Sequence, residues 1–244
     1  MSQTLSLNGW SVRSLSPIKV WATIGFFALA FQIYILTAWI TGPYFKRVPV
    51  GANEPPQWMR IAIDTYTVFG LFAFAFCIWW FIVRPWRRTR TVTTDGMLAI
   101  VWFMLYWLYD PMFNYFNNVF TFNTYAFNMG SWVAHIPGWQ APISPDAQMG
   151  EPFLWCAPMY TYALLPGTIF MCHVMATAQR RWSLGTGGVM VVGWITSFIM
   201  ITVIEFCWMR IGLYTFAGAH EKLTFFYGHY YQYPINESLL WGTA

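Results

Sequence analysis

Hydrophobic residues along the chain are gathered into runs that are long enough to cross a lipid bilayer. The first run extends from Ile18 to Thr41 and carries no charge beyond Lys19. A helix needs about 20 apolar residues to cross the roughly 30 Å hydrocarbon core of a membrane. The pattern therefore predicts a membrane-spanning helix, and Gly42 and Pro43 are expected to end it.

Three further spans are predicted by the same pattern. Residues 59–83 form a second run, and we expect Arg84 and Pro85 to stop its helix because proline has no N–H group for the helical ladder. Two more runs, at residues 152–178 and 184–209, predict two later spans.

Another span is predicted between these runs, from about Asp95 to Tyr109, with Asp95 as its N-terminal cap. It meets Asp110 and Pro111, and a residue that precedes proline disfavours the helical conformation. We therefore expect a break or a kink here, followed by a second helical piece from Pro111 to about Phe120.

Two aromatic loops and a short last segment complete the predicted fold. The loops cover Asn123 to Glu151 and Gly212 to Tyr233, and Pro234 opens a helical stretch at the end of the sequence. This stretch is too short to span a bilayer, so we expect it to be a truncated sixth helix of a longer chain. The predicted fold class is an all-α polytopic bundle of about five spans plus a truncated sixth, with long aromatic outer loops, in a single domain over residues 1–244.

The composition supports this prediction. Charged residues make up only 9% of the chain, whereas apolar residues reach 57% and aromatic residues 21%. An ordinary soluble domain carries about 25% charged residues. The composition therefore excludes a soluble enzyme, a disordered chain and a nucleic-acid-binding protein, and it leaves an integral membrane protein whose first partner is the lipid bilayer.

The basic residues predict an orientation in the cell membrane. Alternating topology places eight of them on one side of the bilayer and five on the other. Loops that are rich in Lys and Arg stay in the cytoplasm, so we expect the richer side to be cytoplasmic. Its eight residues are Arg13, Lys19, Arg84, Arg87, Arg88, Arg90, Arg180 and Arg181.

Four carboxylates share the opposite, outer side of the predicted bundle. They are Asp64, Asp110, Glu205 and Glu237. An ionisable group close to hydrocarbon is costly unless it faces a partner or a cavity. Because all four lie in one zone, we predict a polar pocket that opens toward the outer face.

A structural explanation of the same carboxylates stays open. Acidic groups near helix ends can reach water, and the helix dipole favours them in a first turn, which would account for Glu237 and Asp110. Arg60 and Asp64 are four residues apart and can form an ion pair on one helix face.

Asparagines extend the polar zone. Asp110, Asn114 and Asn117 have the i, i+4, i+7 spacing of one helix face, and Asn118 lies beside it. Such a stripe can hydrogen-bond a substrate with several oxygen atoms, or it can be the wet side of an interfacial helix. The four His and four Cys residues are too scattered to predict a metal site.

Four short motifs carry a resemblance to a known family. They are Tyr109–Asn117 (YDPMFNYFN), Asn128–Trp132 (NMGSW), Ile136–Gln140 (IPGWQ) and Tyr233–Glu237 (YPINE). Together they resemble the spirocyclase AveC family of actinobacterial membrane proteins, over most of the chain. The namesake of that family closes a dihydroxy-ketone into a spiroketal in secondary metabolism and can dehydrate the product. The resemblance implies a membrane-embedded cyclase without a metal or redox cofactor.

The candidate residues suit this chemistry, which needs an acid, a base and an anion that faces a developing cation. The substrate is expected to be an apolar, oxygen-bearing small molecule or a lipid-like molecule. The hypothesis assigns Asp110 and Glu205 to acid and base with Asp64 as a helper, and substrate binding to Asn114, Asn117, Asn118, Glu237 and Arg60.

A non-catalytic protein is the competing hypothesis. The long aromatic loops are also suited to a docking face, as in an accessory subunit of a membrane oxidase, or to a carrier of a lipid or terpenoid. The oligomeric state is not predicted by any of these features.

Overall fold

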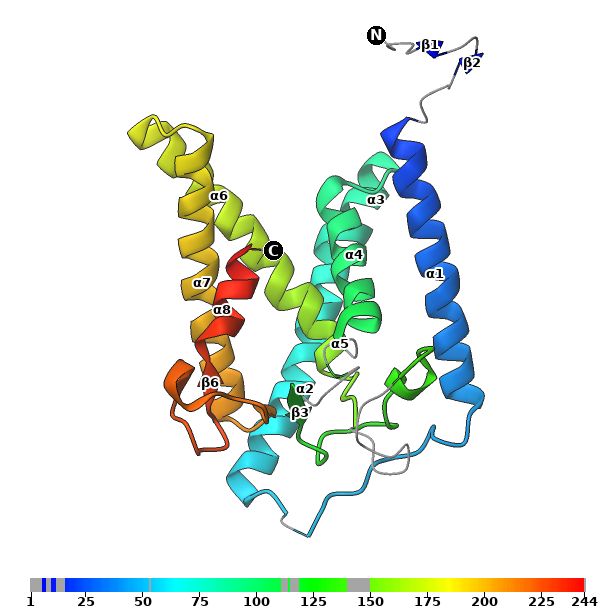
Figure 1. Ribbon diagram of the computed structural model, residues 1–244, viewed down its shortest axis with the longest axis vertical. Coiled ribbons are helices and arrows are strands. Elements are labelled where there is room, and N and C mark those ends of the chain that lie inside the picture. The colour runs from blue at the N-terminus through cyan, green and yellow to red at the C-terminus, as the bar shows by residue number, and fades with distance from the viewer. Residues whose placement is uncertain are drawn as a thin grey trace.

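A computed structural model places most of the chain, and helices dominate it (Figure 1). A pair of two-residue strands, β1 (Ser6–Leu7) and β2 (Trp10–Ser11), precedes the first helix. The structure describes residues 6–7, 10–11, 16–52, 54–110, 114, 119–139 and 150–243.

Helix α1 (Pro17–Thr41) agrees with the first predicted span. The Ser16 hydroxyl caps its start by accepting a hydrogen bond from the Lys19 N–H at 3.4 Å. Most of its large side chains are exposed, and its buried residues form one stripe at Gln32, Ile35 and Trp39. The spacing of this stripe is helical, so α1 contacts the rest of the protein along a single face.

The second span is longer than predicted. Helix α2 (Gln57–Cys77) continues through a π-helical turn, η1 (Ile78–Val83), into α3 (Arg84–Thr89). Together they form 33 continuous helical residues. The expectation that Arg84 and Pro85 end the helix is therefore wrong.

The helix tolerates Pro85 because its backbone partners are rearranged there. The Arg84 N–H bonds to the Trp79 carbonyl, five residues back, as in a π-helix. The Phe81 carbonyl, which Pro85 cannot pair in an α-helix, accepts a hydrogen bond from the Thr93 hydroxyl at 3.4 Å. The helix ends at Arg90, whose backbone is left-handed with φ 58°.

Helix α4 (Thr94–Tyr109) ends directly before Asp110, as predicted. Its N-terminal cap is Thr93, whose hydroxyl accepts a bond from the Gly96 N–H at 3.2 Å, and not Asp95, which lies in the first turn. With 16 residues, α4 falls short of the roughly 20 that a straight crossing needs.

The last two long helices form an antiparallel pair. Helix α5 (Cys156–Met159) continues through a π-helical turn, η5 (Tyr160–Leu164), into α6 (Leu165–Trp182). Ser183, with φ 51°, turns the chain into α7 (Thr186–Arg210). Figure 1 shows α6 diverging from α4 toward the turn that joins it to α7.

The connections at the opposite end contain strands that the sequence did not predict. Strand β3 (Phe120–Phe122) pairs antiparallel with β4 (Tyr214–Phe216). The expected helical piece is therefore wrong at Phe120, while residues 111–113 and 115–118 lie outside the described residues. The described parts of the loops also contain the 3₁₀ turns η3 (Val133–His135) and η6 (Glu221–Leu223). Strands β5 (Thr224–Phe225) and β6 (Tyr233–Pro234) pair as a further antiparallel ribbon.

The final helix, α8 (Ile235–Thr243), begins after Pro234 as predicted and packs against α7. Ser238 is completely buried in this contact, and its hydroxyl lies 2.6 Å from that of Thr202 on α7. It also bonds to the Tyr233 hydroxyl. These contacts hold the start of α8 in place beside β6.

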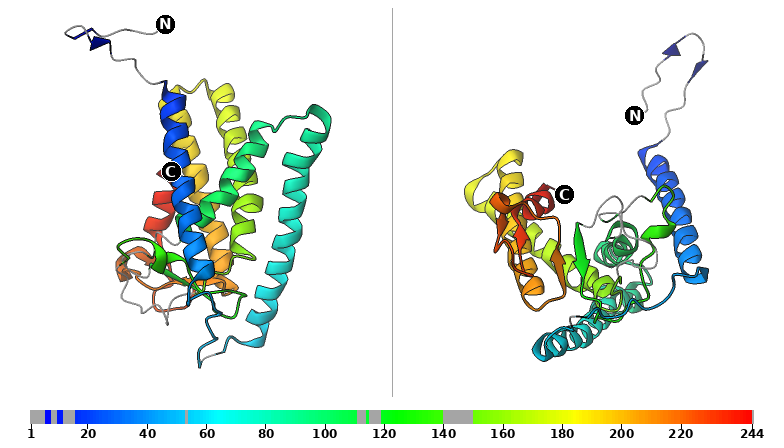
Figure 2. Two further views of the ribbon diagram at one scale, coloured as in Figure 1. Left: turned by 90° about the vertical axis from the view of Figure 1, so that its right-hand side faces the viewer. Right: turned by 60° about the horizontal axis from the view of Figure 1, so that its bottom comes forward.

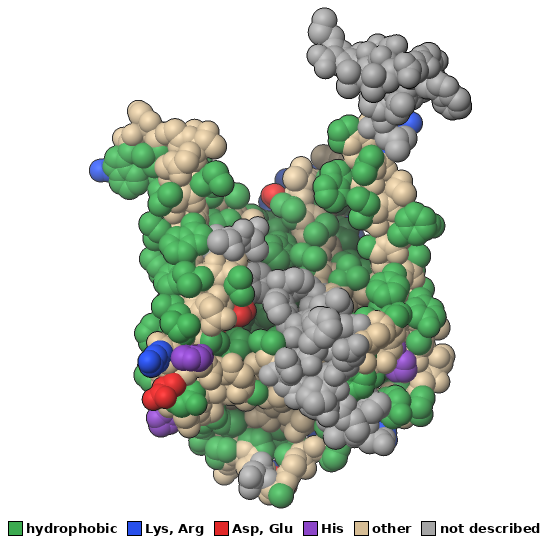
Figure 3. Space-filling model, viewed as in Figure 1, with side chains coloured by type: hydrophobic (Ala, Val, Ile, Leu, Met, Phe, Trp, Pro, Cys, Tyr) green, Lys and Arg blue, Asp and Glu red, His purple; other side chains and the backbone are tan. Residues whose placement is uncertain are grey.

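Four helices in the described part of the chain are long and apolar enough to cross a membrane. They are α1, α2 with η1 and α3, α5 with η5 and α6, and α7. Hydrophobic side chains cover most of their visible surface in Figure 3, as contact with lipid would require. The chain is therefore mostly helical and has the features of an integral membrane protein.

The buried core lies at the loop end of the helices, where most of the strands are also found (Figure 2). It is built mainly of aromatic rings. Trp132 lies 5.3 Å from Trp39 of α1 and 5.4 Å from Tyr106 of α4, measured between ring centroids. This end is therefore the packed part of the molecule, and the candidate site lies in it.

Candidate functional site

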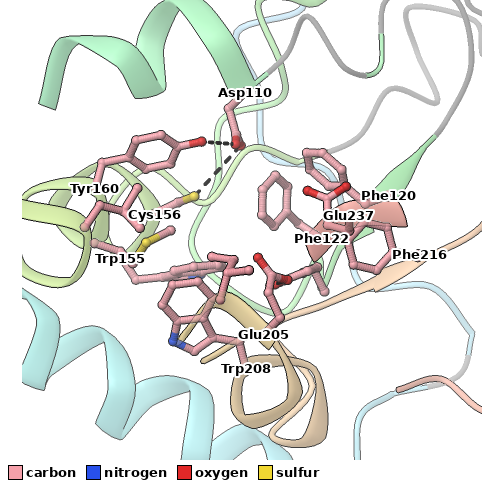
Figure 4. A pocket seen from close by; sticks show the side chains of 14 residues that line it. Asp110, Phe120, Phe122, Trp155, Cys156, Tyr160, Glu205, Trp208, Phe216 and Glu237 are labelled. Atoms are coloured by element: carbon pink, nitrogen blue, oxygen red, sulfur yellow. Dashed lines mark hydrogen bonds between the residues drawn. The ribbon is translucent and has the colours of Figure 1, made fainter. Parts of the chain in front are cut away.

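Three of the four predicted carboxylates line one cavity at the loop end of the helices. Figure 4 shows Asp110, Glu205 and Glu237 around a common space. They come from the end of α4, from α7 and from α8, which are far apart in the sequence. Only the tertiary fold brings them together.

Asp110 lies past the end of α4 and is 6% exposed. Its carboxylate accepts a hydrogen bond from the Tyr160 hydroxyl at 2.8 Å, and the Cys156 sulfur lies 3.9 Å from its other oxygen. Burial raises the pKa of Asp110 to about 7, the two hydrogen bonds act in the opposite direction, and nearby Glu237 raises it. Asp110 is therefore suited to exchange a proton near neutral pH.

Glu205 lies on the last turns of α7 and is 7% exposed. Its carboxylate accepts a hydrogen bond from the hydroxyl of Tyr214 on β4. Helix α7 ends at Arg210 and the chain reverses within a few residues, so β4 returns alongside the helix. This reversal places the tyrosine beside the carboxylate.

Glu237 is in the first turn of α8 and is half-buried. Its neighbour Ser238 is bonded to Thr202 and Tyr233, which fixes the start of α8 against α7. Glu237 is thereby directed toward the cavity, where it adds to the negative charge that Asp110 and Glu205 experience (Figure 4).

Aromatic rings form most of the remaining wall. A low-dielectric wall strengthens every charge interaction inside the cavity, and a negative carboxylate there would stabilise a developing cation. The rings are those of Phe120, Phe122, Trp155, Tyr160, Trp208, Tyr214 and Phe216.

The cavity has a volume of about 50 Å³. A water molecule occupies about 30 Å³ of liquid, so this space suits water better than an organic substrate. Sites for small organic molecules reach roughly 300 Å³ or more. A substrate that reacts between these carboxylates must therefore extend beyond this cavity.

Asp64 and Arg60, the two predicted site residues on α2, lie elsewhere. Asp64 accepts a hydrogen bond from the Tyr125 hydroxyl at 2.8 Å, at the surface. Arg60 forms an exposed ion pair with Glu54 at 3.2 Å. Neither of the two lines the cavity between the carboxylates.

Asn114 is 1% exposed and also does not line that cavity. Its side-chain oxygen accepts hydrogen bonds from the N–H groups of Val119 at 2.9 Å and Phe120 at 3.4 Å. It thereby shapes the entry into β3. Asn117 and Asn118 lie outside the described residues.

Glu151 is a buried carboxylate that the sequence analysis did not select. It is fully buried and accepts a hydrogen bond from the Ser131 hydroxyl at 3.3 Å. Burial and the nearby charge of Asp110 raise its pKa well above the usual value. The sequence carried one signal, a lone acid before Pro152 at the boundary of an aromatic loop and a helix.

The hydrogen-bond donors of the site were also missed. Tyr160, Tyr214 and Cys156 touch the carboxylates, but they are three among many aromatic and apolar residues. Their chemistry depends on which carboxylate each one meets, and no local pattern records that.

No three His, Cys, Asp or Glu side chains in the described part of the chain form a group that could hold a metal ion. A larger groove of about 400 Å³ lies between α6 and α7, near Arg181 and Trp182. His173 lines it, and no carboxylate does.

A family model described as "Spirocyclase AveC-like" matches residues 86–244, which is more than half of the chain. Comparisons with curated proteins and with solved structures give no match. The matched region contains Asp110, Glu205 and Glu237, whereas Asp64 lies before it.

Proposed function

Because the chain belongs to the spirocyclase AveC-like family, we propose that it is a membrane enzyme that cyclises an apolar, hydroxylated ketone by acid–base chemistry. The family is named for a spirocyclase. The observation that carries the proposal is the meeting of Asp110, Glu205 and Glu237, from three separate segments, in one aromatic cavity. We further propose that the cavity faces the outer side of the cell membrane.

The proposed reaction converts a dihydroxy-ketone into a spiroketal and one water molecule. One hydroxyl oxygen attacks the ketone carbon and loses its proton, while the ketone oxygen gains one and becomes a hemiketal hydroxyl. That hydroxyl is protonated and leaves as water, which produces an oxocarbenium ion. The second hydroxyl then attacks this ion and loses its proton, so protons balance over the cycle.

Asp110 is proposed as the acid in this series of reaction steps. Its pKa of about 7 keeps much of it protonated at neutral pH, so it can give a proton to the departing hydroxyl. Tyr160, which donates to the same carboxylate, holds it in position for that transfer.

Glu205 is proposed as the base, and Glu237 as the anion that faces the oxocarbenium ion. Glu205 already acts as a hydrogen-bond acceptor toward Tyr214, so its oxygens are arranged to take a proton from an attacking hydroxyl. Asp64 and Arg60, which lie outside the cavity, are left as secondary candidates for holding the substrate at the surface.

The proposal is tested with Asp110→Asn and Glu205→Gln. Both variants keep the size of the side chain and remove its acid–base function. We expect each to lower the rate of cyclisation by about 10²-fold or more, measured with a purified dihydroxy-ketone in lipid nanodiscs against the uncatalysed rate. Asp95→Asn, in the first turn of α4 and outside the cavity, is the matched control.

Full activity in both acid variants would contradict the assignment of these residues. A wild-type protein that binds the dihydroxy-ketone but does not accelerate its cyclisation would instead support the carrier hypothesis. Either conclusion requires that Asp95→Asn cyclises the substrate at the wild-type rate.

A further inference from the structure

The β3–β4 ribbon has two chemically different faces. Its antiparallel register pairs Phe122 with Tyr214 and Thr121 with Thr215. Side chains alternate between the two faces of a strand, so the aromatic residues share one face and the threonines the other. The aromatic face lines the cavity that holds the carboxylates.

A second cavity lies on the threonine face of the same ribbon. Its volume is about 160 Å³, and Thr121, Thr215, Asn123 and Tyr230 are among the residues that line it. Tyr230 is 42% exposed, so this cavity borders the surface. The ribbon is therefore a partition between an outer cavity and the acidic one.

The outer cavity offers hydrogen-bonding groups without any carboxylate. Among the described residues, neither the Thr121 hydroxyl nor the Thr215 hydroxyl has a hydrogen-bond partner. Each hydroxyl can therefore donate to and accept from a ligand. The side chain of Asn123 is held beside them because it donates to the Gly212 carbonyl at 2.9 Å.

The two cavities meet at one aromatic pair. Phe122 and Tyr214 line both of them, with ring centroids 6.0 Å apart. The Tyr214 hydroxyl reaches through to Glu205 in the acidic cavity. A molecule that passes this pair would contact the carboxylates on one side and the threonines on the other.

Size indicates that one substrate occupies both spaces. Enclosed sites for small organic molecules reach roughly 300 Å³, and neither cavity alone approaches that volume. Phe122 and Tyr214, which lie where the two cavities meet, are buried in the aromatic core at 8% and 9% exposure. The two cavities together still fall short of that volume, so a ketone with a hydroxylated chain fits only when this pair moves aside.

We propose that the cavity on the threonine face of the β3–β4 ribbon is a second substrate-binding compartment, which takes a hydroxylated segment of the substrate while the reacting carbons lie between the carboxylates. This inference rests on the proposed function for the identity of the reacting end. It assigns chain-length selectivity to Thr121 and Thr215, on the face away from the acids.

Two diols that cannot react serve as probes, each with a methylene in place of the ketone. The short diol has four methylenes on each side of that position, and the long diol also carries a hydroxylated alkyl tail. Thr215→Phe fills the outer cavity with a ring. Thr224→Phe places the same ring on the β5–β6 ribbon, and Thr224 lines neither cavity.

We expect Thr215→Phe to raise the Kd of the long diol by about tenfold and that of the short diol by less than about twofold. Kd is measured by calorimetry in lipid nanodiscs, with empty nanodiscs subtracted, and Thr224→Phe should change neither value. Thr121→Phe, together with the double variant Thr121→Val and Thr215→Val, keeps the test decisive if Thr215→Phe does not fold.

An equal effect on both diols, no effect on either, or no binding of the long diol by the wild-type protein overturns the inference. The proposed function fails separately, when the wild-type protein binds the long diol selectively but does not cyclise the matching ketone. In the converse case, the protein cyclises both ketones while Thr215→Phe leaves the ratio of the long-ketone rate to the short-ketone rate unchanged. That result contradicts the second compartment, whereas the proposed function stands.

Discussion

Asp110 has two donors on its carboxylate and almost no contact with solvent. Burial favours its neutral form, whereas the Tyr160 and Cys156 hydrogen bonds favour the charged form. Its pKa of about 7 is the balance of these opposing effects. Any change to one donor should therefore move the pH at which the residue loses its proton.

Replacing Tyr160 with Phe tests this balance. Because the protonated form of Asp110 is the proposed acid, the wild-type cyclisation rate should fall as the pH rises through about 7. Loss of the tyrosine hydroxyl destabilises the charged carboxylate, so the fall should shift upward by about one pH unit. The measurement is the pH dependence of the rate, and a downward shift would contradict the assignment. Tyr34→Phe, on the exposed face of α1, is the control.

Glu151 allows a second prediction, on stability. Its pKa is raised above the usual 4.5 in the folded protein, so the stability associated with its proton is complete below 4.5 and is lost as the pH rises through the folded value. Glu151→Gln cannot ionise, so its unfolding midpoint in detergent should rise relative to wild type as the pH increases from about 5 toward the raised pKa of Glu151.

The matched control for this experiment is Glu221→Gln, an exposed acid in η6. Its difference from wild type should stay constant over the same range. A constant difference for Glu151→Gln as well would show that Glu151 ionises at its ordinary pH in the folded protein.

At the scale of elements, helix α1 is attached by one stripe of side chains. Gln32 donates to the Trp107 carbonyl of α4 at 2.6 Å, and Trp39 packs against Trp132 and Phe45. The Trp132 indole N–H donates to the same Trp107 carbonyl at 2.9 Å. The packing of α1 thus depends on the aromatic loop as much as on another helix.

Trp39→Ala should therefore lower the free energy of unfolding by about 3–5 kcal/mol, the usual cost of deleting a buried tryptophan. Trp21→Ala removes the same side chain from the same helix, where it is 71% exposed, and should have little effect. Unfolding is followed by tryptophan fluorescence in detergent, and equal losses in both variants would show that α1 is not held by this stripe.

Elements were predicted well where they depend on local composition. The runs of apolar residues placed α1, α7 and the end of α4 to within a few residues. The continuation past Pro85 was not predictable, because the carbonyl that proline leaves unpaired finds its donor in Thr93, beyond the helix. The β3–β4 ribbon was missed because its two strands lie far apart in the chain.

At the scale of the whole molecule, the helix ends form two groups. The link between α3 and α4 lies at the same end as the turn between α6 and α7, and strands β3 to β6 lie at the other end (Figure 1). The basic residues of the first end predict that it faces the cytoplasm.

Cysteine labelling tests this orientation. In a background without Cys77, Cys156, Cys172 and Cys207, Lys222→Cys in η6 should react with a membrane-impermeant maleimide in intact cells. Thr91→Cys, between α3 and α4, should react only after permeabilisation, because charged reagents do not cross the bilayer. The reverse pattern would place the carboxylate cavity on the cytoplasmic side.

The lipid environment, the helical class and the candidate acids could all be predicted from the sequence. These features depend on local counts: the length of an apolar run, and the rarity of a charge within or beside one. Which of the acids meet depends instead on the tertiary fold. It joined Asp110, Glu205 and Glu237 in one cavity and left Asp64 at the surface with Tyr125. The reason is physical, since contacts between distant segments depend on packing, and the composition of one segment does not record its partner.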